Sequence, residues 1–247
     1  MPNNPVILSK RLDFAAYGID IVFEDAALKY LAHRAHNENT GARGLVSAVE
    51  DALLPYEEKL PSSTVTRLVV NQAVITDPSE TLKDLLSDHP VNDWDAVYQQ
   101  AVENDIQYLT DYVQNNADTL SAGHGLDLTP VRCDMTARYF RTHVLEIDDA
   151  LKKIRRAYDG VKEIEREIAQ NMNLNIFFEE DAVDFLMRQF IEHRVSSEDI
   201  LSNLYNAFYD GLNLIKEKTG RNRFFLTRAN LLDSEACLND LIRKEIK

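Results

Sequence analysis

The feature that most restricts how this chain can fold is an internal repeat. Residues 21–54 align without a gap with residues 176–209, and one further inserted residue aligns 67–70 with 223–226. The alignment preserves apolar positions in the order strand, helix, helix, strand, which predicts two similar α+β units. The alternative is two unrelated amphipathic helix pairs. The identical pairs are Ile21 with Ile176, Phe23 with Phe178, Glu24 with Glu179, Ala27 with Ala182, Leu31 with Leu186, Ser47 with Ser202 and Ala52 with Ala207.

Proline and glycine spacing predicts that most of the remaining chain is helical. All seven prolines lie at or before Pro130, and only three glycines follow that residue, so the C-terminal half lacks helix breakers. The expected elements are a helix at 6–16, a strand at 19–23, helices at 24–37 and 42–58, a hairpin of two short strands at 67–70 and 73–76, a linker at 77–92, a helix at 93–117, a loop at 121–128 and a long helix at 130–170.

The long predicted helix carries a seam of apolar residues. From Cys133 to Ile168 these residues recur in alternating steps of three and four, and Glu165 breaks the pattern. Such a heptad seam favours pairing with another helix, so we expect an antiparallel helical hairpin with the helix at 93–117. The expected domains are an α+β unit at 1–87, a helical insertion at 88–172 and a degenerate copy of the first unit at 173–247.

The charge of the chain argues against nucleic-acid binding. Its formal net charge is −14 at pH 7, and all three expected domains are acidic, so a basic face that neutralises phosphates is hard to assemble. No run of about 18 uncharged apolar residues is present, and the N-terminus lacks an apolar signal-peptide core. Cys133 and Cys237 lie far apart and outside any metal-binding spacing. We therefore expect a cytoplasmic protein with reduced, packed thiols and no membrane partner.

One short motif suggests a function. The sequence TGARGL occupies residues 40–45, at the start of the predicted helix 42–58. Arg43 would add a full positive charge to the exposed N–H groups of that helix start, and its planar guanidinium can hold two phosphate oxygens. Gly41 and Gly44 would allow a sharp turn of the backbone. Such an arginine is suited to detecting a γ-phosphate; the alternative is a solvated residue in the first turn of an amphipathic helix.

The segment 19–76 resembles the small C-terminal domain of ClpX-type AAA+ protein unfoldases, the ATPase partners of a compartmental protease. The resemblance rests on IVFEDAALKYLAHRA, TGARGL, VEDALLPYEEKLPSS and VTRLVVNQAVI, which follow one another in the family's order. It covers about the first 80 residues, roughly a third of the chain. In that family a Gly-Ala-Arg at a helix start is the sensor-2 motif. The resemblance therefore implies that Gly41, Ala42 and Arg43 sense a nucleotide phosphate bound by a separate large domain.

The resemblance also implies a fold and a set of partners. The expected fold is α+β and mostly helical: an AAA+ lid domain with a small β-sheet, a long helical hairpin and a degenerate lid-like repeat. The parent protein would use ATP and Mg, form a hexamer from large domains and neighbouring subunits, and work with a protease ring on protein substrates or adaptors. In the second copy Glu198 stands at the position of Arg43, so that copy cannot contact phosphate in the same way.

The chain lacks the residues that bind and cleave ATP. It has no Gly-Lys pair for a P-loop and no strand that ends in Asp-Glu to hold magnesium. We therefore expect it to bind no cofactor by itself, and interpret it as a fragment of a longer ATPase; the alternative is a non-enzymatic adaptor with a lid-like fold. No catalytic residue is expected, because the sequence shows no nucleophile signature. No metal-binding residue is expected either, because His33 and His36 lack a third ligand at metal spacing.

Overall fold

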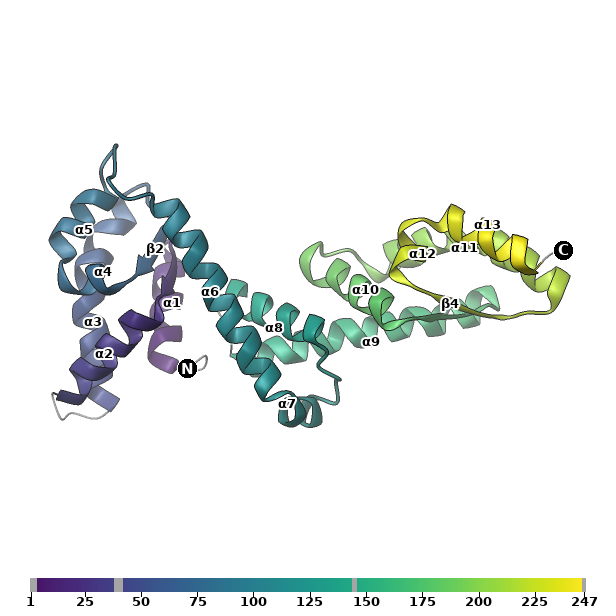
Figure 1. Cartoon of the computed structure of the whole chain (residues 1–247), viewed down its shortest axis with the longest axis horizontal. Coiled ribbons are helices and arrows are strands. Elements are labelled where there is room, and N and C mark those ends of the chain that lie inside the picture. The colour runs from purple at the N-terminus through teal and green to yellow at the C-terminus, as the bar shows by residue number, and fades with distance from the viewer. Residues whose placement is uncertain (1–3, 38–41, 144–145, 246–247) are drawn as a thin grey trace. The chain divides into compact units, whose positions relative to one another are not determined.

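The computed structural model describes residues 4–37, 42–143 and 146–245, which fall into two compact units (Figure 1). Unit 1 comprises residues 1–116 and 140–147, and unit 2 comprises residues 117–139 and 148–247. The expected segment 1–87 lies wholly in unit 1 and the expected segment 173–247 wholly in unit 2, whereas residues 88–172 are shared between them. No helix within the described residues is long and apolar enough to span a membrane.

Each unit consists mainly of helices and contains two short strands. Its elements are α1 (Pro5–Ala16), β1 (Asp20–Phe23), α2 (Asp25–Asn37), α3 (Ala42–Lys59), a 3-10 turn (Leu60–Ser62), β2 (Arg67–Val70), α4 (Gln72–Thr76), α5 (Pro78–Leu85) and α6 (Trp94–Asn115), with the end of α8 (Pro130–His143). Unit 2 contains α7 (Ala117–His124), the start of α8, α9 (Ile147–Met172), β3 (Asn175–Phe178), α10 (Glu180–Glu192), α11 (Ser197–Thr219), β4 (Arg223–Leu226), α12 (Arg228–Leu232) and α13 (Ser234–Glu245).

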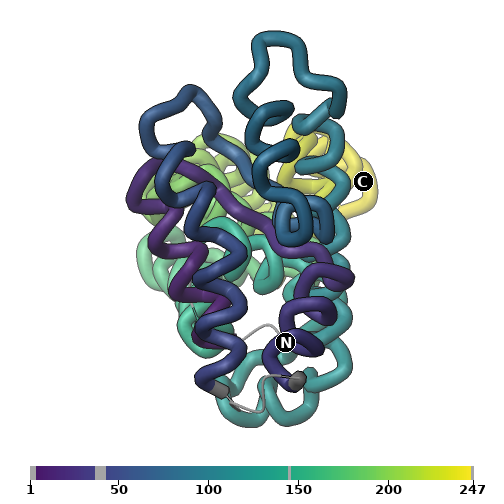
Figure 2. The backbone as a smooth tube through the Cα atoms, turned by 90° about the vertical axis from the view of Figure 1, so that its left-hand side faces the viewer, coloured from purple at the N-terminus to yellow at the C-terminus, as the bar shows by residue number. Residues whose placement is uncertain are grey.

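A two-stranded parallel sheet lies at the centre of unit 1. Asp20 pairs with Arg67 at one end of the sheet and Phe23 with Val70 at the other. The antiparallel helices α2 and α3 lie side by side (Figure 2) and bury their apolar residues with those of α1 and one face of the sheet. Helix α6 covers the opposite face. The core residues include Phe14, Ile21, Ala27, Leu31, Val49, Leu53, Tyr56, Leu68, Val70 and Val74.

The predicted hairpin at 67–76 is wrong. The first segment is β2, but it pairs in parallel with β1, and the chain continues directly into helix α4. The Asn71 side chain accepts a hydrogen bond from the Val74 N–H at 3.0 Å and so caps α4. A run as short as 73–76 does not distinguish strand from helix by its apolar pattern, and the asparagine that suggested a turn is a helix cap.

The predicted linker, loop and long helix also need correction. Residues 78–85 of the linker form α5, which begins with Pro78 after an Asp77 cap. The first residues of the predicted loop at 121–128 belong to α7, which ends at His124. The next residue, Gly125, adopts a left-handed backbone conformation with φ of 60°. The long helix is two helices, α8 and α9. The heptad seam continues across the break, but two aspartates in the first turn of α9 are a start signal that periodicity alone does not register.

The repeat predicted from the sequence is present in the fold. Strands β3 and β4 form a second parallel sheet, in which Asn175 pairs with Arg223 and Phe178 with Leu226, as the alignment with β1 and β2 requires. Helices α10, α11, α12 and α13 follow in the same order as α2, α3, α4 and α5. A backbone hydrogen bond just after β1 recurs just after β3: the Glu24 N–H donates to the Val70 carbonyl at 3.0 Å, and the Glu179 N–H donates to the Leu226 carbonyl at 2.9 Å.

Helix caps and core positions repeat as well. Thr227 caps α12 as Asn71 caps α4, and Asp233 accepts a hydrogen bond from the Ala236 N–H as Asp77 does from the Glu80 N–H. Aligned apolar residues on the inner face of each copy are buried in both: Ile21 and Ile176, Phe23 and Phe178, Ala27 and Ala182, Leu31 and Leu186, Leu53 and Phe208, Leu68 and Phe224, Val70 and Leu226. Burial of equivalent positions explains why the apolar pattern was detectable in the sequence.

Candidate functional site

The predicted phosphate-sensing motif lies at the start of α3. Ala42 is the first residue of the helix, and Arg43, the second, has an exposed side chain. Gly41 lies outside the described residues, whereas Gly44 is buried. A helix start exposes N–H groups that lack partners within the helix, and an exposed arginine beside them is free to approach an anion held by another domain. No other residue in the first turn of α3 is charged.

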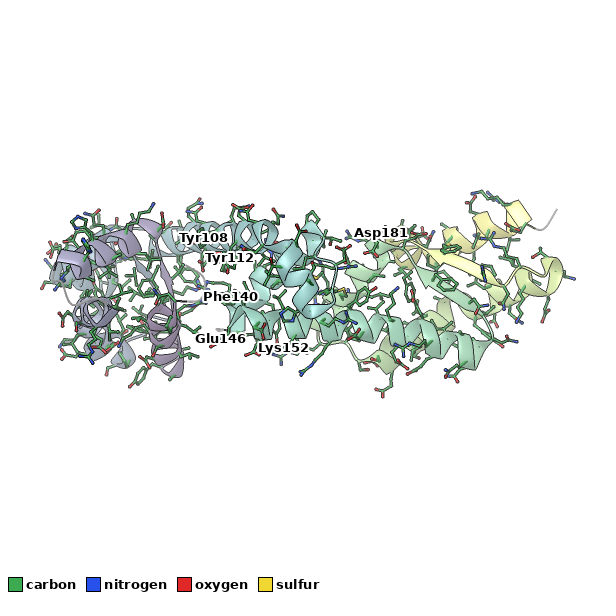
Figure 3. The ribbon with its side chains drawn as sticks, turned by 90° about the horizontal axis from the view of Figure 1, so that it is seen from below. Tyr108, Tyr112, Phe140, Glu146, Lys152 and Asp181 are labelled. Carbon is green, nitrogen blue, oxygen red and sulfur yellow. The ribbon has the colours of Figure 1, made fainter. Side chains whose placement is uncertain are left out.

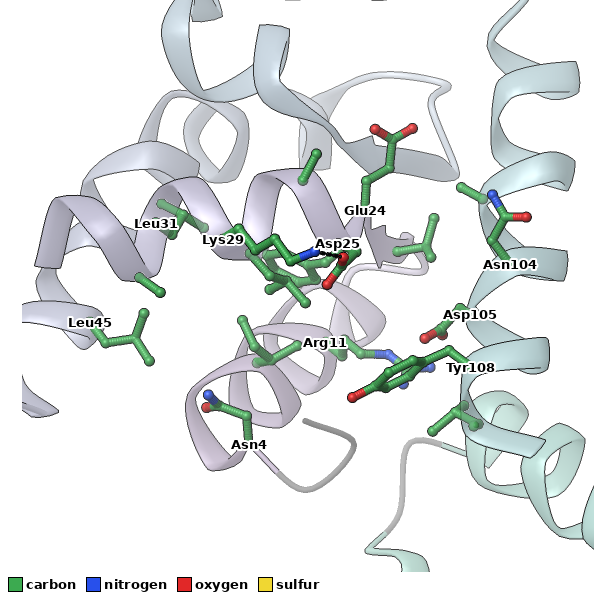
Figure 4. Close-up of a pocket in the computed structure, with 18 of the residues that line it drawn as sticks. Asn4, Arg11, Glu24, Asp25, Lys29, Leu31, Leu45, Asn104, Asp105 and Tyr108 are labelled. Carbon is green, nitrogen blue, oxygen red and sulfur yellow. Dashed lines mark ion pairs between the residues drawn. The ribbon is translucent and has the colours of Figure 1, made fainter. Parts of the chain in front are cut away.

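A cleft of about 690 Å³ opens in unit 1 beside this helix start. Helices α1, α2 and α6 and the end of β1 form most of its wall, and Leu45 of α3 reaches its edge (Figure 4). Arg43 does not line the cleft. Residues two apart on a helix point about 200° away from each other, so the helix turn that gives Leu45 to the cleft presents Arg43 to another side.

Buried charge lies at the inner end of the cleft. Arg141 is 4% exposed and makes a bidentate ion pair with Asp20, at 3.0 and 3.1 Å. Its Nε lies 3.2 Å from an Asp105 carboxylate oxygen. The Tyr98 hydroxyl donates a short hydrogen bond to Asp20. Burial raises the pKa of the Asp105 carboxyl, although the nearby arginines counteract this change, and burial together with the Asp20 bond raises the pKa of Tyr98 to about 12.

Arg11 is the cationic residue that this cluster presents to the cleft. Its side chain is 7% exposed and donates from Nη2 to the Arg141 carbonyl oxygen at 2.5 Å, while its Nε has no hydrogen-bond partner within the part of the chain that the structure describes. Burial, and next the positive charge of Arg141, lower the pKa of Arg11 to about 10. The group stays protonated at neutral pH, so Arg11 and Arg141 hold two buried positive charges next to two carboxylates.

Aromatic and ionic side chains complete the outer part of the cleft. Tyr108 and Tyr112 lie on successive turns of α6, and Phe140 lies on α8 (Figure 3); Tyr108 and Phe140 contribute to the cleft wall. Asp25 and Lys29 of α2 form an ion pair of 2.5 Å at the mouth, where both side chains are largely exposed. Such an exposed pair contributes little to stability, so it leaves both charges accessible to a binding partner.

Sequence reasoning did not find the charged cluster. It joins residues up to 130 positions apart, such as Arg11 and Arg141, and the sequence gives no spacing signal for a contact of that length. Tyr98 is buried like a core residue, but its hydroxyl also takes part in the cluster. Among the described residues, no group of three or more His, Cys, Asp or Glu side chains is placed to hold a metal ion.

The equivalent helix start in unit 2 has the opposite charge. Helix α11 begins after a Ser196 cap, and its first turn carries Glu198 and Asp199. The Glu198 side chain is exposed at the position that Arg43 occupies in the first copy. An acidic first turn complements the positive end of the helix from within, so this start repels rather than attracts a phosphate.

Comparison with known proteins gives matches to the first part of the chain. Residues 6–62 match the family described as the C-terminal, D2-small domain of ClpB protein. The chain is 32% identical over 82 residues to the ATP-dependent Clp protease ATP-binding subunit ClpX 2 of Wolinella succinogenes, an alignment that covers 33% of this chain and 21% of the relative. It is 38% identical over 66 residues to the ClpX subunit of Azotobacter vinelandii, covering 27% of this chain and 15% of that relative.

A eukaryotic relative matches over a similar length. The mitochondrial ATP-dependent ClpX-like chaperone of Saccharomyces cerevisiae is 30% identical over 86 residues, which are 35% of this chain and 16% of the relative. The chain therefore spans only about a fifth or less of the length of these curated relatives. No solved structure matches the chain significantly.

The matches cover the first part of unit 1. Residues 6–62 are similar to a C-terminal small domain of the AAA+ class, and in this chain they belong to a unit of helices around a two-stranded parallel sheet. The similarity to the ClpX proteins, over 66 to 86 residues, points to a lid domain of the ClpX type. The family match ends at residue 62, so α6 and all of unit 2 lie beyond it.

Proposed function

We propose that unit 1 is the nucleotide-sensing lid of a ClpX-type protein unfoldase, and that Arg43 contacts the γ-phosphate of ATP bound by a separate large domain. The observation that carries this proposal is the exposed guanidinium at the start of α3 in a domain of this class. A guanidinium is permanently charged and forms paired hydrogen bonds with phosphate oxygens. Gly41 and Ala42 would shape the approach of the backbone to the nucleotide.

Helix α3 is suited to pass a local contact to the whole lid. Val49, Leu53 and Tyr56 lie on successive turns after Arg43, and all three are fully buried in the core of unit 1. The Tyr56 hydroxyl also donates to the Val74 carbonyl at 3.0 Å, which ties α3 to α4. Because a packed core moves as one body, a pull on the start of α3 would move the lid rather than bend the helix.

The remaining parts of this function are supplied by other domains. ATP and Mg would be bound by the large domain, because this chain has no P-loop sequence. The lid would join that domain to a neighbouring subunit in a hexameric ring. Its motion would couple ATP hydrolysis to the unfolding of protein substrates for a protease ring. The names of the relatives describe such ATP-binding subunits of a protease and a chaperone.

The test is an Arg43→Ala substitution in the complete ATPase that contains this unit. Loss of a charge-assisted hydrogen-bond pair is expected to lower ATP turnover, or its coupling to unfolding of a tagged substrate, about tenfold or more. Lys59→Ala is the matched control, because Lys59 is an exposed cation at the other end of α3. Both variants should keep the wild-type thermal transition. Wild-type rates of ATP hydrolysis and unfolding in Arg43→Ala would exclude the sensor role.

The alternative function is a non-enzymatic adaptor that uses the same fold for binding. Such an adaptor needs no residues that bind or cleave ATP, and this sequence has no Gly-Lys pair for a P-loop. The two functions differ in their dependence on nucleotide. An adaptor would bind its partners equally well with ATP, with ADP or without nucleotide, and Arg43→Ala would leave that binding unchanged.

A further inference from the structure

The outer face of the second sheet is aromatic and exposed. Phe177 of β3 and Phe225 of β4 lie directly opposite each other in the strand register, and they are 41% and 58% exposed. Their rings stack with centroids 5.6 Å apart. Side chains on a strand alternate between two faces, so Asn175 and Arg223 share this face, while Ile176 and Phe224 point into the core. We call these four residues, Asn175, Phe177, Arg223 and Phe225, the outer face of unit 2.

The first copy shows what covers such a face. Val22 and Val69 occupy the positions of Phe177 and Phe225, and they are only 2% and 1% exposed. Helix α6 covers them with Tyr98 and Ala101, together with the half-buried Val97 and Val102. The same sheet is therefore built twice, once beneath a helix and once open on the face that the helix would occupy.

The two sheet faces also differ in how their arginines are paired. In the first copy Arg67 donates to Asp95 of α6 at 2.9 Å, and its guanidinium carbon lies 5.3 Å from the centre of the Tyr98 ring. Arg223 is the equivalent of Arg67, but its side chain has no hydrogen-bond or ion-pair partner among the described residues. The acidic Asp20 of the first face is replaced by Asn175. The outer face of unit 2 thus carries a positive charge and no carboxylate.

We propose that the outer face of unit 2 docks an amphipathic helix of a partner protein, with a carboxylate near the start of the helix's apolar stripe. The apolar stripe would cover Phe177 and Phe225, and the carboxylate would pair with Arg223 as Asp95 pairs with Arg67. A helix that lays its apolar side on such a face gains burial of aromatic surface, and the ion pair sets its direction. This interaction surface is independent of the nucleotide-sensing role proposed for Arg43.

A second copy of this chain does not supply that helix. The apolar side of α6 already lies against its own sheet, where Tyr98 and Ala101 are buried. The two phenylalanines also occupy more volume than the two valines, so a helix at close range needs small residues where α6 has Tyr98. A single-stranded nucleic acid also uses exposed aromatic rings and cations, but the net charge of −14 opposes it.

The first experiment uses a stapled helical peptide with the sequence of residues 93–115, in which alanine replaces Tyr98 to make room for the two phenylalanines, titrated into the full chain labelled with ¹⁵N. We expect shifts of the amide signals of β3 and β4, and saturable binding. The double variant Phe177→Ser with Phe225→Ser should weaken binding at least tenfold. Leu214→Ser is the matched control, because Leu214 is 41% exposed on α11, and it should leave binding unchanged. No shifts in β3 and β4 at saturating peptide would refute the proposal.

A charge exchange tests the ion pair separately from folding. Arg223→Glu should weaken binding of this peptide by about fivefold or more, and the same peptide with Asp95→Lys should restore binding to the variant. Failure of the exchanged pair to recover binding would contradict the assigned direction of the helix. Two further outcomes would overturn the proposal: a dimer of the chain in sedimentation that the phenylalanine variants abolish, or binding of an oligo-dT strand in place of the peptide.

Discussion

At the scale of single residues, unit 1 combines an exposed arginine at a helix start with two buried arginines. Arg43 is exposed, whereas Arg11 and Arg141 are buried beside Asp20 and Asp105. A buried arginine is costly unless its charge is balanced and its N–H groups find acceptors, and removal of one partner leaves the other charge uncompensated. The buried cluster is therefore a structural feature that fixes α1, α6 and the end of α8, and the exposed Arg43 is the residue for which we propose phosphate binding.

Burial also determines the chemistry of the cysteines. Cys133 and Cys237 are free and buried, and burial raises the pKa of the Cys133 thiol from 9.0 to about 11. In a Cys237→Ala variant at pH 8, we expect Cys133 to react with a disulfide reagent many times more slowly in the folded protein than in urea, because only the thiolate reacts. Equal rates, measured by release of the coloured thiol, would contradict the burial of this residue.

The same pKa change predicts a pH dependence of stability. Because the folded chain holds the Cys133 proton to a higher pH than the unfolded chain, the contribution of this group is complete below pH 9.0. It is lost as the pH rises towards about 11, since the unfolded chain then ionises first. The free energy of unfolding, measured in urea across this range, should fall less steeply in a Cys133→Ala variant.

At the scale of elements, short-range signals decide where helices begin. Asn71 and Thr227 start the equivalent helices α4 and α12 by accepting hydrogen bonds from the backbone N–H groups of Val74 and Asn230. The two helices have five residues each, too few to form without a cap and tertiary support. This is why the asparagine after β2 was mistaken for a turn residue, since turns and caps use the same side-chain hydrogen bonds.

Removal of either capping side chain is expected to lower the free energy of unfolding by a similar amount. Asn71→Ala and Thr227→Ala should each lower the free energy of unfolding by about 1 kcal/mol, because an N–H donor loses its acceptor. The equilibrium is measured by urea unfolding with circular dichroism. Asn92→Ala, in the exposed segment before α6, serves as the control, because it removes an exposed side-chain hydrogen bond to Asp84 but no helix cap. A loss in that control as large as in the caps would indicate a non-specific effect.

At the scale of the whole molecule, one structural plan is used twice with different surroundings. Both copies bury the same set of aligned positions around a parallel two-stranded sheet. They differ on the surface: Glu198 stands at the aligned position of Arg43, and the exposed phenylalanines of one sheet stand at the positions of the covered valines of the other. Duplication with a retained core and changed surfaces is consistent with two different binding roles, because function depends on the site rather than on the fold.

The two cores are expected to respond separately to core substitutions. Leu53 and Phe208 are aligned, buried residues of α3 and α11. Leu53→Ala and Phe208→Ala should each cost about 3 kcal/mol, because each leaves a cavity in a packed core. Hydrogen exchange read by mass spectrometry should show lost protection mainly in unit 1 for the first variant and mainly in unit 2 for the second. Equal loss in both units for either variant would mean that the chain unfolds as one cooperative body.

The sequence alone determined the repeated core, the strands β1 and β2, the main helices and the resemblance to a ClpX-type lid, because these depend on apolar periodicity and local motifs. Tertiary structure alone decided that β2 pairs in parallel with β1, that the heptad seam is divided between α8 and α9, and that Arg11 meets Arg141. It also decided which sheet face is covered. Strand pairing, buried ion pairs and covering helices join residues far apart in the chain, and a local pattern carries no information about which distant partner satisfies them.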